Sequence, residues 1–224
     1  KRQNKEFQPR IRMSSSESKV KSKLILSKNL NFNHEKLQKI EFFVNEVLSY
    51  NKKYNLISKN SEKDIWHRHV LDSAQLIKHI DSKKFNILSD LGTGGGFPGI
   101  ILSIFYNDIL TFHVKLYEKS KVKSNFLKGV VEKLGLKNTS IYDNDYQYHV
   151  LDSGYIVCRA FKKLSEVLRI SRETTKKPHK LIVMLGKNAQ EELNKASKDS
   201  INKYKLVTSI TSSDSKIFLL NANE

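Results

Sequence analysis

The sequence of 224 residues contains only one cysteine, Cys158. A single cysteine excludes an internal disulfide bond and a zinc site built from cysteines, and it is consistent with a reducing cytoplasm. The apolar run GIILSIFY is far shorter than the roughly 20 residues that a transmembrane helix requires. No apolar segment follows the first basic residues, as it would in a secretory signal peptide. We therefore predict a cytoplasmic protein without a membrane span.

Negative charge is also scarce, because 23 Asp and Glu stand against 40 Lys and Arg, for a net charge of +17. An excess of this size favours a polyanionic partner, although a general lysine bias that keeps the protein soluble is the alternative. Residues 1–30 alone hold nine basic and two acidic residues. We predict that they form a disordered basic tail.

Helical periodicity dominates residues 31–82. The segment NHEKLQKIEFFVNEVLSYNKKYNL spaces its apolar residues for one face of a helix, with Asn33 as its N-cap. A second helix is predicted over SEKDIWHRHVLDSAQLIKHI, where Ser61 and Asp64 resemble a capping box. These two helices form a predicted N-terminal cap.

Strands alternate with helices over residues 83–224. The predicted strands are FNILSDL, FHVKLYE, TSIYD, YIVCRAF and KLIVML, and the helices between the first of them are PGIILSIFY and KSNFLKGVVEKLG. Two further strands, YKLVTSI and KIFLLNA, are separated by the turn-forming residues SSDS. The pattern predicts an α/β fold with a doubly wound sheet of five parallel strands and a closing hairpin, which is a methyltransferase-like layout.

The glycine-rich stretch LSDLGTGGGFPGIILSI predicts a nucleoside cofactor. Gly94 to Gly99 match the dinucleotide pattern G-x-G-x-x-G, but Asp90 at the preceding strand end suits a cation better than a pyrophosphate. S-adenosylmethionine carries a sulfonium and an ammonium group that a carboxylate can face. Glu118 ends the next strand, where an acid accepts ribose hydroxyls in either kind of site. A tight turn without a ligand and an exposed strand-end acid are the structural alternatives.

Several segments in order resemble the RsmG (GidB) family, which methylates N7 of one guanine in bacterial 16S rRNA. They are YNKKYNLIS, HRHVLDS, DLGTGGGFPGIILSI, SNFLKGVVEKLGLKN and VCRAFKKLSEVL. The resemblance implies a class I S-adenosylmethionine-dependent methyltransferase fold with a small N-terminal helical cap, and a substrate in the small ribosomal subunit. We predict a mostly parallel seven-stranded sheet and a monomer. The resemblance also implies cofactor contacts at Gly92, Phe97, Tyr146, Gln147 and Arg159, in addition to Asp90, Gly94 and Glu118.

Methylation at N7 needs no general base, because neutral guanine carries a lone pair and no proton there. We therefore predict no catalytic dyad; alignment of the reacting atoms supplies most of the rate. A polar cluster is formed by His67, Arg68, His69 and Asp72, and it either contacts the substrate or joins the cap to the main domain. We predict no metal site there, because the sequence offers no third metal ligand at a suitable spacing. For Arg159 a structural salt bridge is the alternative, and for Tyr50 and Tyr54 packing is favoured over base stacking.

Two other classes of function stay open at this point. An NAD-type reductase would use the Gly94 to Gly99 match, but it is disfavoured by Asp90 and by the lack of a Tyr-x-x-x-Lys pair. An RNA-binding homologue without catalysis is kept open by Asp145 and Gln147, which stand where the family commonly has Arg and Glu.

Overall fold

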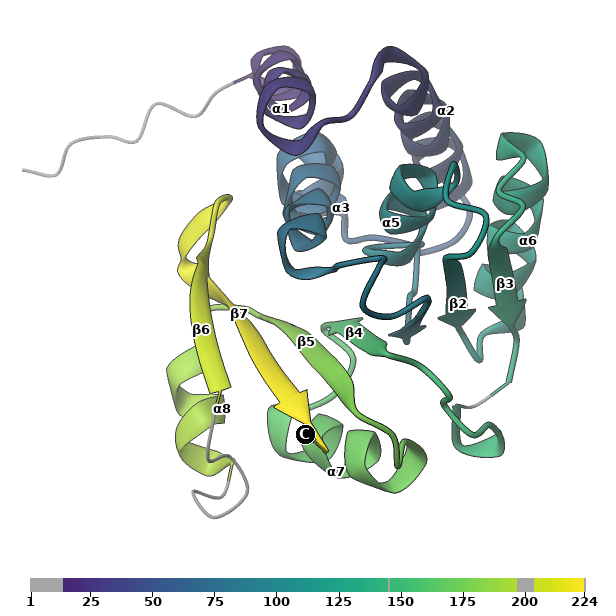
Figure 1. Ribbon diagram of the computed structural model, residues 1–224. Coiled ribbons are helices and arrows are strands. Elements are labelled where there is room, and N and C mark those ends of the chain that lie inside the picture. Colours follow the sequence, from purple (N-terminus) through teal and green to yellow (C-terminus); the bar gives the residue numbers. More distant parts are fainter. Residues whose placement is uncertain (1–13, 145, 197–203, 224) are drawn as a thin grey trace, which may run out of the picture.

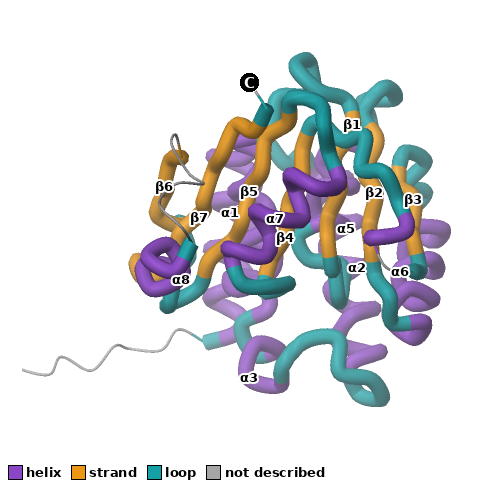
Figure 2. The backbone as a smooth tube through the Cα atoms, turned by 90° about the horizontal axis from the view of Figure 1, so that it is seen from below, coloured by secondary structure: helices purple, strands orange, loops and turns teal. Residues whose placement is uncertain are grey.

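A seven-stranded sheet forms the centre of the protein in a computed structural model, which describes residues 14–144, 146–196 and 204–223 (Figures 1 and 2). The strand order is β3-β2-β1-β4-β5-β7-β6. The strands are β1 (Ile87–Leu91), β2 (His113–Tyr117), β3 (Thr139–Tyr142), β4 (Tyr155–Arg159), β5 (His179–Leu185), β6 (Tyr204–Ser209) and β7 (Ser212–Ala222). Strands β1 to β5 run parallel, and β7 is antiparallel to both β5 and β6. The predicted layout is confirmed.

Helices cover both faces of this sheet (Figure 2). One face carries α5 (Gly99–Tyr106) and α6 (Lys121–Leu134), and the other carries α7 (Leu164–Thr174) and α8 (Ala189–Lys195). Strand β4 shows why the sheet needs both layers. Tyr155 and Val157 belong to the hydrophobic cluster on the first face, whereas Ile156 and Cys158 belong to the cluster on the second. Apolar residues fill the first four positions of β4 and are buried on both sides of the sheet, as expected in a doubly wound fold.

The N-terminal helices pack on the α5 face, above the sheet in Figure 1. Helix α2 (His34–Asn51) begins as predicted, because the Asn33 side chain accepts a hydrogen bond from the Lys36 amide at 2.9 Å. The buried residues of α2 share one continuous core with β1 and α5. Whether residues 31–82 form a unit apart from residues 83–224 stays a prediction.

The prediction of a disordered tail is wrong for residues 15–30, which form helix α1 (Ser15–Leu30). Ser14 and Glu17 make a capping box at its start. The buried side of α1 consists of Ser18, Ser22, Leu26 and Leu30. The two serines are small and polar, so they weaken the hydrophobic pattern of the helix. Residues 1–13 lie outside the described residues.

The second predicted cap helix is instead a broken helical segment. Helix α3 (Lys59–Glu62) begins after Ser58 rather than at Ser61, and it is followed by the π-helix η1 (Trp66–Leu71), α4 (Asp72–Ala74) and the 3-10 helix η2 (Gln75–His79). The predicted capping box fails because the Asp64 carboxylate accepts its hydrogen bond from Ser18 of α1.

The terminal hairpin turns earlier than expected. The sequence predicts a turn at SSDS, but the turn lies at residues 210–211, and β7 already begins at Ser212. Ser209 pairs directly with Ser212 across the turn. The hairpin therefore extends β7 to 11 residues, and its tip reaches the cap segment.

Candidate functional site

The glycine loop follows β1 at the carboxyl end of the sheet. The amides of Gly92 and Thr93 both donate to the Tyr117 carbonyl of β2, at 2.9 and 3.1 Å. Gly92 has a φ of 68°, where a side chain is strained, and an added Cβ would overlap the ring of Phe161. Gly94 has a φ of 60°, and an added Cβ there would meet only the Gly92 carbonyl oxygen, at 3.9 Å. The space beside Gly92 is thus filled by Phe161, whereas the space beside Gly94 is open.

Asp90 lies beneath this loop. Its side chain is fully buried, and its Oδ2 accepts a hydrogen bond from the Gly99 amide at 2.8 Å. Burial raises the pKa of Asp90 to about 7. A carboxylate in this position ties the last glycine of the loop to β1, and it does not line the cavity described below.

Glu118 lies beside the loop, at the end of β2. Its Oε2 accepts a hydrogen bond from the Gly94 amide at 3.0 Å, and its Oε1 accepts one from the Ser120 amide at 2.8 Å. Both contacts hold the carboxylate in one orientation at the edge of the cavity. A carboxylate can accept further hydrogen bonds, so hydroxyl groups of a ligand remain suitable partners.

A cavity of about 500 Å³, here called the cofactor cavity, opens over these residues. The carboxyl ends of β1, β2 and β4 meet there, which is where open α/β sheets bind ligands. Seven of the eight predicted cofactor residues line it: Gly92, Gly94, Phe97, Glu118, Tyr146, Gln147 and Arg159. Asp90 is the exception. Asp145 lies outside the described residues.

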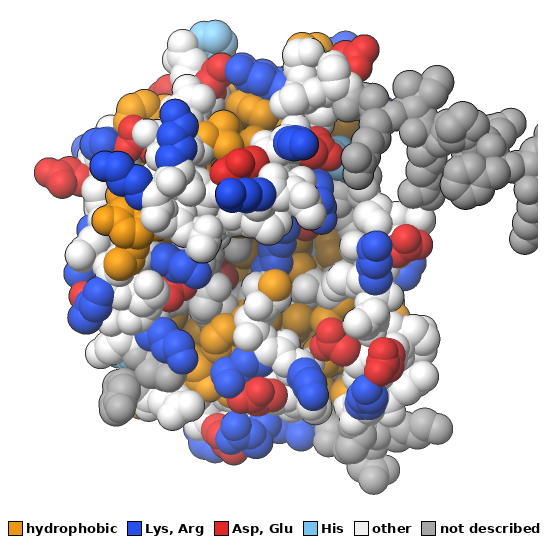
Figure 3. Space-filling view, turned by 180° about the vertical axis from the view of Figure 1, so that it is seen from behind, with side chains coloured by type: hydrophobic (Ala, Val, Ile, Leu, Met, Phe, Trp, Pro, Cys, Tyr) orange, Lys and Arg blue, Asp and Glu red, His pale blue; other side chains and the backbone are white. Residues whose placement is uncertain are grey.

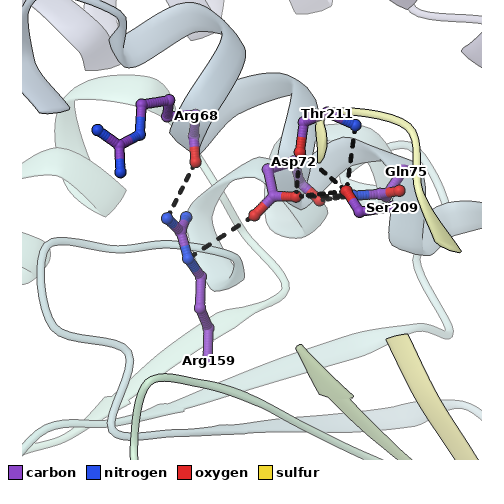
Figure 4. Close-up of polar contacts among 6 residues, drawn as sticks. All are labelled: Arg68, Asp72, Gln75, Arg159, Ser209 and Thr211. Carbon is purple, nitrogen blue, oxygen red and sulfur yellow. Dashed lines mark hydrogen bonds and ion pairs between the residues drawn. The ribbon is translucent and has the colours of Figure 1, made fainter. Parts of the chain in front are cut away.

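Arg159 ends β4 and joins the sheet to the cap (Figure 4). Its Nη2 donates to the Arg68 carbonyl at 2.9 Å, and its Nε lies 3.8 Å from Asp72 Oδ2. The other oxygen of Asp72 accepts from Gln75, Ser209 and Thr211. Nη1 of Arg159 is buried and has no hydrogen-bond partner within residues 14–144, 146–196 and 204–223. The salt bridge and the cavity position therefore occur together, and neither excludes the other.

His69 is a residue of the cap that also lines the cofactor cavity. Its ring packs on Phe97 with centroids 4.9 Å apart, and both ring nitrogens are buried without a partner in the described part of the chain. Burial, together with the positive charges of Arg159 and Arg68, lowers the pKa of His69 to about 3. His69 is therefore neutral at physiological pH and serves neither as a cation nor as a readily protonated base.

Other lining residues were missed by the sequence analysis. They are Leu56, Ile57, Thr93, Gly95, Tyr117, Lys119, Lys123, Asn144, Ala160, Phe161 and Lys162. Tyr117 and Phe161 stand next to predicted strand ends, and that position was the one signal available. Leu56 and Ile57 carry no such signal; Asn51 holds their backbone amides through its Oδ1, at 2.6 and 3.0 Å.

Tyr50 packs against the core as expected, whereas Tyr54 is exposed and contacts Tyr50. Their rings lie 4.7 Å apart, and Tyr50 also contacts Phe126 at 4.8 Å. Among the residues that the structure describes, no group of three acidic, histidine or cysteine side chains is arranged to hold a metal ion. No helix in this same part of the chain is long and apolar enough to cross a membrane.

The sheet order, with a glycine loop at the carboxyl end of β1, defines the fold of S-adenosylmethionine-dependent methyltransferases. A methyltransferase from Aquifex aeolicus described as S-adenosylmethionine-dependent superposes with a TM-score of 0.56 at 16% identity, over 75% of this chain and 97% of its own. A putative O-methyltransferase from Klebsiella pneumoniae gives a TM-score of 0.58 at 9% identity, over 92% and 98% of the two chains. Similarity at these identities shows the fold.

The particular family follows from sequence. The family model for rRNA small subunit methyltransferase G (GidB) matches residues 36–219, and the chain belongs to this family. The ribosomal RNA small subunit methyltransferase G of Pelagibacter ubique is 40% identical over 88% of this chain and 92% of its own length. The protein of the same name from Rickettsia bellii is 34% identical over 82% of this chain and 92% of its own. The family resemblance that the sequence motifs indicate is confirmed.

Proposed function

We propose that this protein transfers a methyl group from S-adenosylmethionine to N7 of a guanine in the 16S rRNA of the small ribosomal subunit. The observation that carries the proposal is the cofactor cavity, built at the carboxyl ends of β1, β2 and β4 in a chain of the rRNA small subunit methyltransferase G family. The names of the curated relatives refer to small-subunit ribosomal RNA. Neither an NAD-type reductase nor a non-catalytic RNA-binding protein is favoured by these relatives.

The cavity residues fit S-adenosylmethionine. A volume of about 500 Å³ lies within the usual range for a small-ligand site. Glu118 presents a fixed carboxylate for the ribose hydroxyls, and the open side of Gly94 admits the ligand close to the backbone. The unpartnered Nη1 of Arg159 is a buried donor of the kind that a ligand carboxylate satisfies. Asp90 supports the loop from below instead of contacting the cofactor.

The reaction asks little acid–base chemistry of the protein. The bound cofactor supplies an electrophilic methyl group on a sulfonium, and guanine N7 supplies the lone pair. Neutral His69 and Cys158, whose buried thiol has a raised pKa, are both unsuited to act as an ionised base or nucleophile at neutral pH. The protein therefore acts by aligning N7 with the methyl group and by excluding water, and no residue is required to carry a proton.

The charge supports an RNA partner. Lysine and arginine side chains are spread between acidic and neutral ones over the face in Figure 3. A net charge of +17 distributed in this way favours contacts with many phosphates over one local anion site. We further infer that the protein works as a monomer in the cytoplasm, where the small subunit is assembled and modified.

Transfer of a labelled methyl group tests the proposal. Small subunits from a strain that lacks its own enzyme should take up label from S-adenosylmethionine when this protein is added, and large subunits should not. Measurement under single-turnover conditions separates a slow enzyme from a non-catalytic binding protein. Equal labelling of both subunits, or binding of small subunits without any transfer, would contradict the proposal.

A further inference from the structure

A second cavity, of about 620 Å³, lies beside the cofactor cavity. Its walls come from the cap segment 64–72, the carboxyl ends of β4 and β5, and the hairpin of β6 and β7. Four consecutive residues, Arg159 to Lys162, line both cavities, so the two cavities adjoin there. The function proposed above assigns nothing to this second cavity, here called the acceptor cavity.

Five buried apolar residues contribute to the lining of the acceptor cavity: Cys158, Val183, Met184, Leu185 and Ile217. Phe161, an aromatic residue, lines both cavities. This ring is held in place from the cofactor side, because it packs over Gly92 and meets Tyr146 edge to face with centroids 5.5 Å apart. A planar base finds an apolar surface and a fixed ring here.

The rim of the acceptor cavity is polar, and two of its basic side chains are available to contact a ligand. Arg68 and Lys187 line the cavity and are exposed, and neither side chain makes a hydrogen bond or ion pair with any other described residue. In Figure 4 the Arg68 guanidinium points away from the cluster around Asp72. By contrast, Lys216 already donates to the Thr208 hydroxyl and the Ser213 carbonyl.

The acidic side chains of the same cavity are engaged by protein groups. Asp72 accepts hydrogen bonds from the hairpin and faces Arg159. Glu192 accepts a hydrogen bond from the Leu164 amide at 2.9 Å, and Asp64 accepts one from Ser18. Arginine and lysine side chains outnumber carboxylates in the lining of this cavity, Arg68, Arg159, Lys162, Lys187 and Lys216 against Asp64, Asp72 and Glu192. The net charge of the lining is therefore positive, as a phosphate-bearing ligand requires.

We propose that the acceptor cavity holds the target nucleotide of the RNA, with the base against Phe161 and the flanking phosphates at Arg68 and Lys187. This inference rests on the proposed function and adds to it the residues that receive the acceptor. The shared lining explains the arrangement: the two cavities adjoin at Arg159 to Lys162, and direct methyl transfer requires the base and the cofactor to be neighbours. The cap and the sheet each supply one phosphate contact, so the nucleotide bridges them.

Binding of guanosine 3′,5′-bisphosphate tests the assignment directly, because this probe carries the base and both flanking phosphates. Equilibrium dialysis of the full chain with saturating S-adenosylhomocysteine should show tighter binding of the bisphosphate than of guanosine. Arg68→Ala and Lys187→Ala should each weaken bisphosphate binding about tenfold and leave guanosine binding unchanged, since a charge-assisted contact of about 1.4 kcal/mol corresponds to that factor. Phe161→Leu should weaken binding of both probes, and Phe161→Tyr should restore it.

Lys83→Ala is the matched control. Lys83 is equally exposed and equally free of polar side-chain contacts within the described residues, but it precedes β1 at the opposite edge of the sheet. It should bind the bisphosphate as the unchanged protein does. Unaltered affinity in the Arg68→Ala Lys187→Ala double variant, or competition between bisphosphate and S-adenosylhomocysteine for one site, would overturn the assignment. Specific bisphosphate binding without methylation of small subunits would instead refute the proposed function and leave the nucleotide site standing.

Discussion

Replacing Gly92 with alanine should weaken both the fold and cofactor binding, for a reason that the structure makes specific. At a φ of 68° any residue with a Cβ is strained, at a cost of about 1–2 kcal/mol. The added Cβ would also overlap the ring of Phe161, and pushing a packed ring aside costs about 1–3 kcal/mol. Because Phe161 lines the cofactor cavity, its displacement changes the shape of the site as well as its stability.

Gly135→Ala supplies the matched control. Gly135 follows α6 with a φ of 61°, so it carries the same backbone strain, but an added Cβ would have nothing within 4 Å. Backbone strain should therefore lower the free energy of unfolding of both variants by about 1–2 kcal/mol. Only Gly92→Ala should show the additional loss of stability that comes from displacing the Phe161 ring. Only Gly92→Ala should bind S-adenosylhomocysteine more weakly.

Urea unfolding followed by circular dichroism gives the two free energies of unfolding, and calorimetric titration gives the affinities. Equal stability losses in the two variants, with unchanged S-adenosylhomocysteine affinity in Gly92→Ala, would refute the contact between the loop and Phe161. Gly92→Val carries a larger side chain at the same position and should abolish binding.

Three further predictions concern other parts of the chain. Arg159→Ala should weaken S-adenosylhomocysteine binding and leave a folded protein, because Asp72 keeps its hydrogen bonds from Gln75, Ser209 and Thr211; a lower melting temperature with normal activity per molecule would show a purely structural salt bridge. Burial raises the pKa of Asp90 to about 7, so the folded protein holds this proton more tightly than the unfolded chain does, and stability should fall as pH rises from about 4 to about 7. Asp90→Asn should make the free energy of unfolding, measured with urea between pH 5 and pH 8, fall less steeply with pH. An equal pH dependence of the unfolding free energy in the two proteins would contradict this role of Asp90. Deleting residues 1–13 removes five basic residues and one acidic residue, so RNA binding should weaken and its log–log salt slope should flatten by about 0.7–0.9 per lost phosphate contact, with S-adenosylhomocysteine affinity unchanged. An identical salt slope after the deletion would leave RNA binding to residues 14–224.

Local patterns in the sequence were sufficient to predict the sheet. Each predicted strand is a short apolar run bounded by turn residues, and the lack of room for a helix between the last two strands required a hairpin. Helix α1 was not predicted because small buried serines interrupt its apolar side and lysines dominate its composition. The capping pair of Ser61 and Asp64 failed for a long-range reason, since Asp64 is bound by Ser18, 46 residues earlier in the chain.

The two cavities differ in how well sequence could predict them. Most of the cofactor cavity follows the ends of consecutive strands, so Gly92, Glu118 and Arg159 could be placed by counting along the chain. The sequence predicts a ligand contact for Asp90, whereas in the structure its side chain lies beneath the loop and accepts a hydrogen bond from the Gly99 amide. The acceptor cavity joins segments more than 100 residues apart, and no local pattern marks Arg68 and Lys187 as neighbours of one space.

The central claim is methyl transfer to guanine N7, and identification of the methylated nucleoside tests it most directly. Small-subunit RNA from a strain without its own enzyme should contain no 7-methylguanosine at the target position before treatment. After incubation with this protein and S-adenosylmethionine, nuclease digestion and mass spectrometry should find one new 7-methylguanosine per subunit, confined to 16S rRNA. A methyl group on another base or another guanine atom, or no methyl group despite measured S-adenosylmethionine binding, would contradict the account.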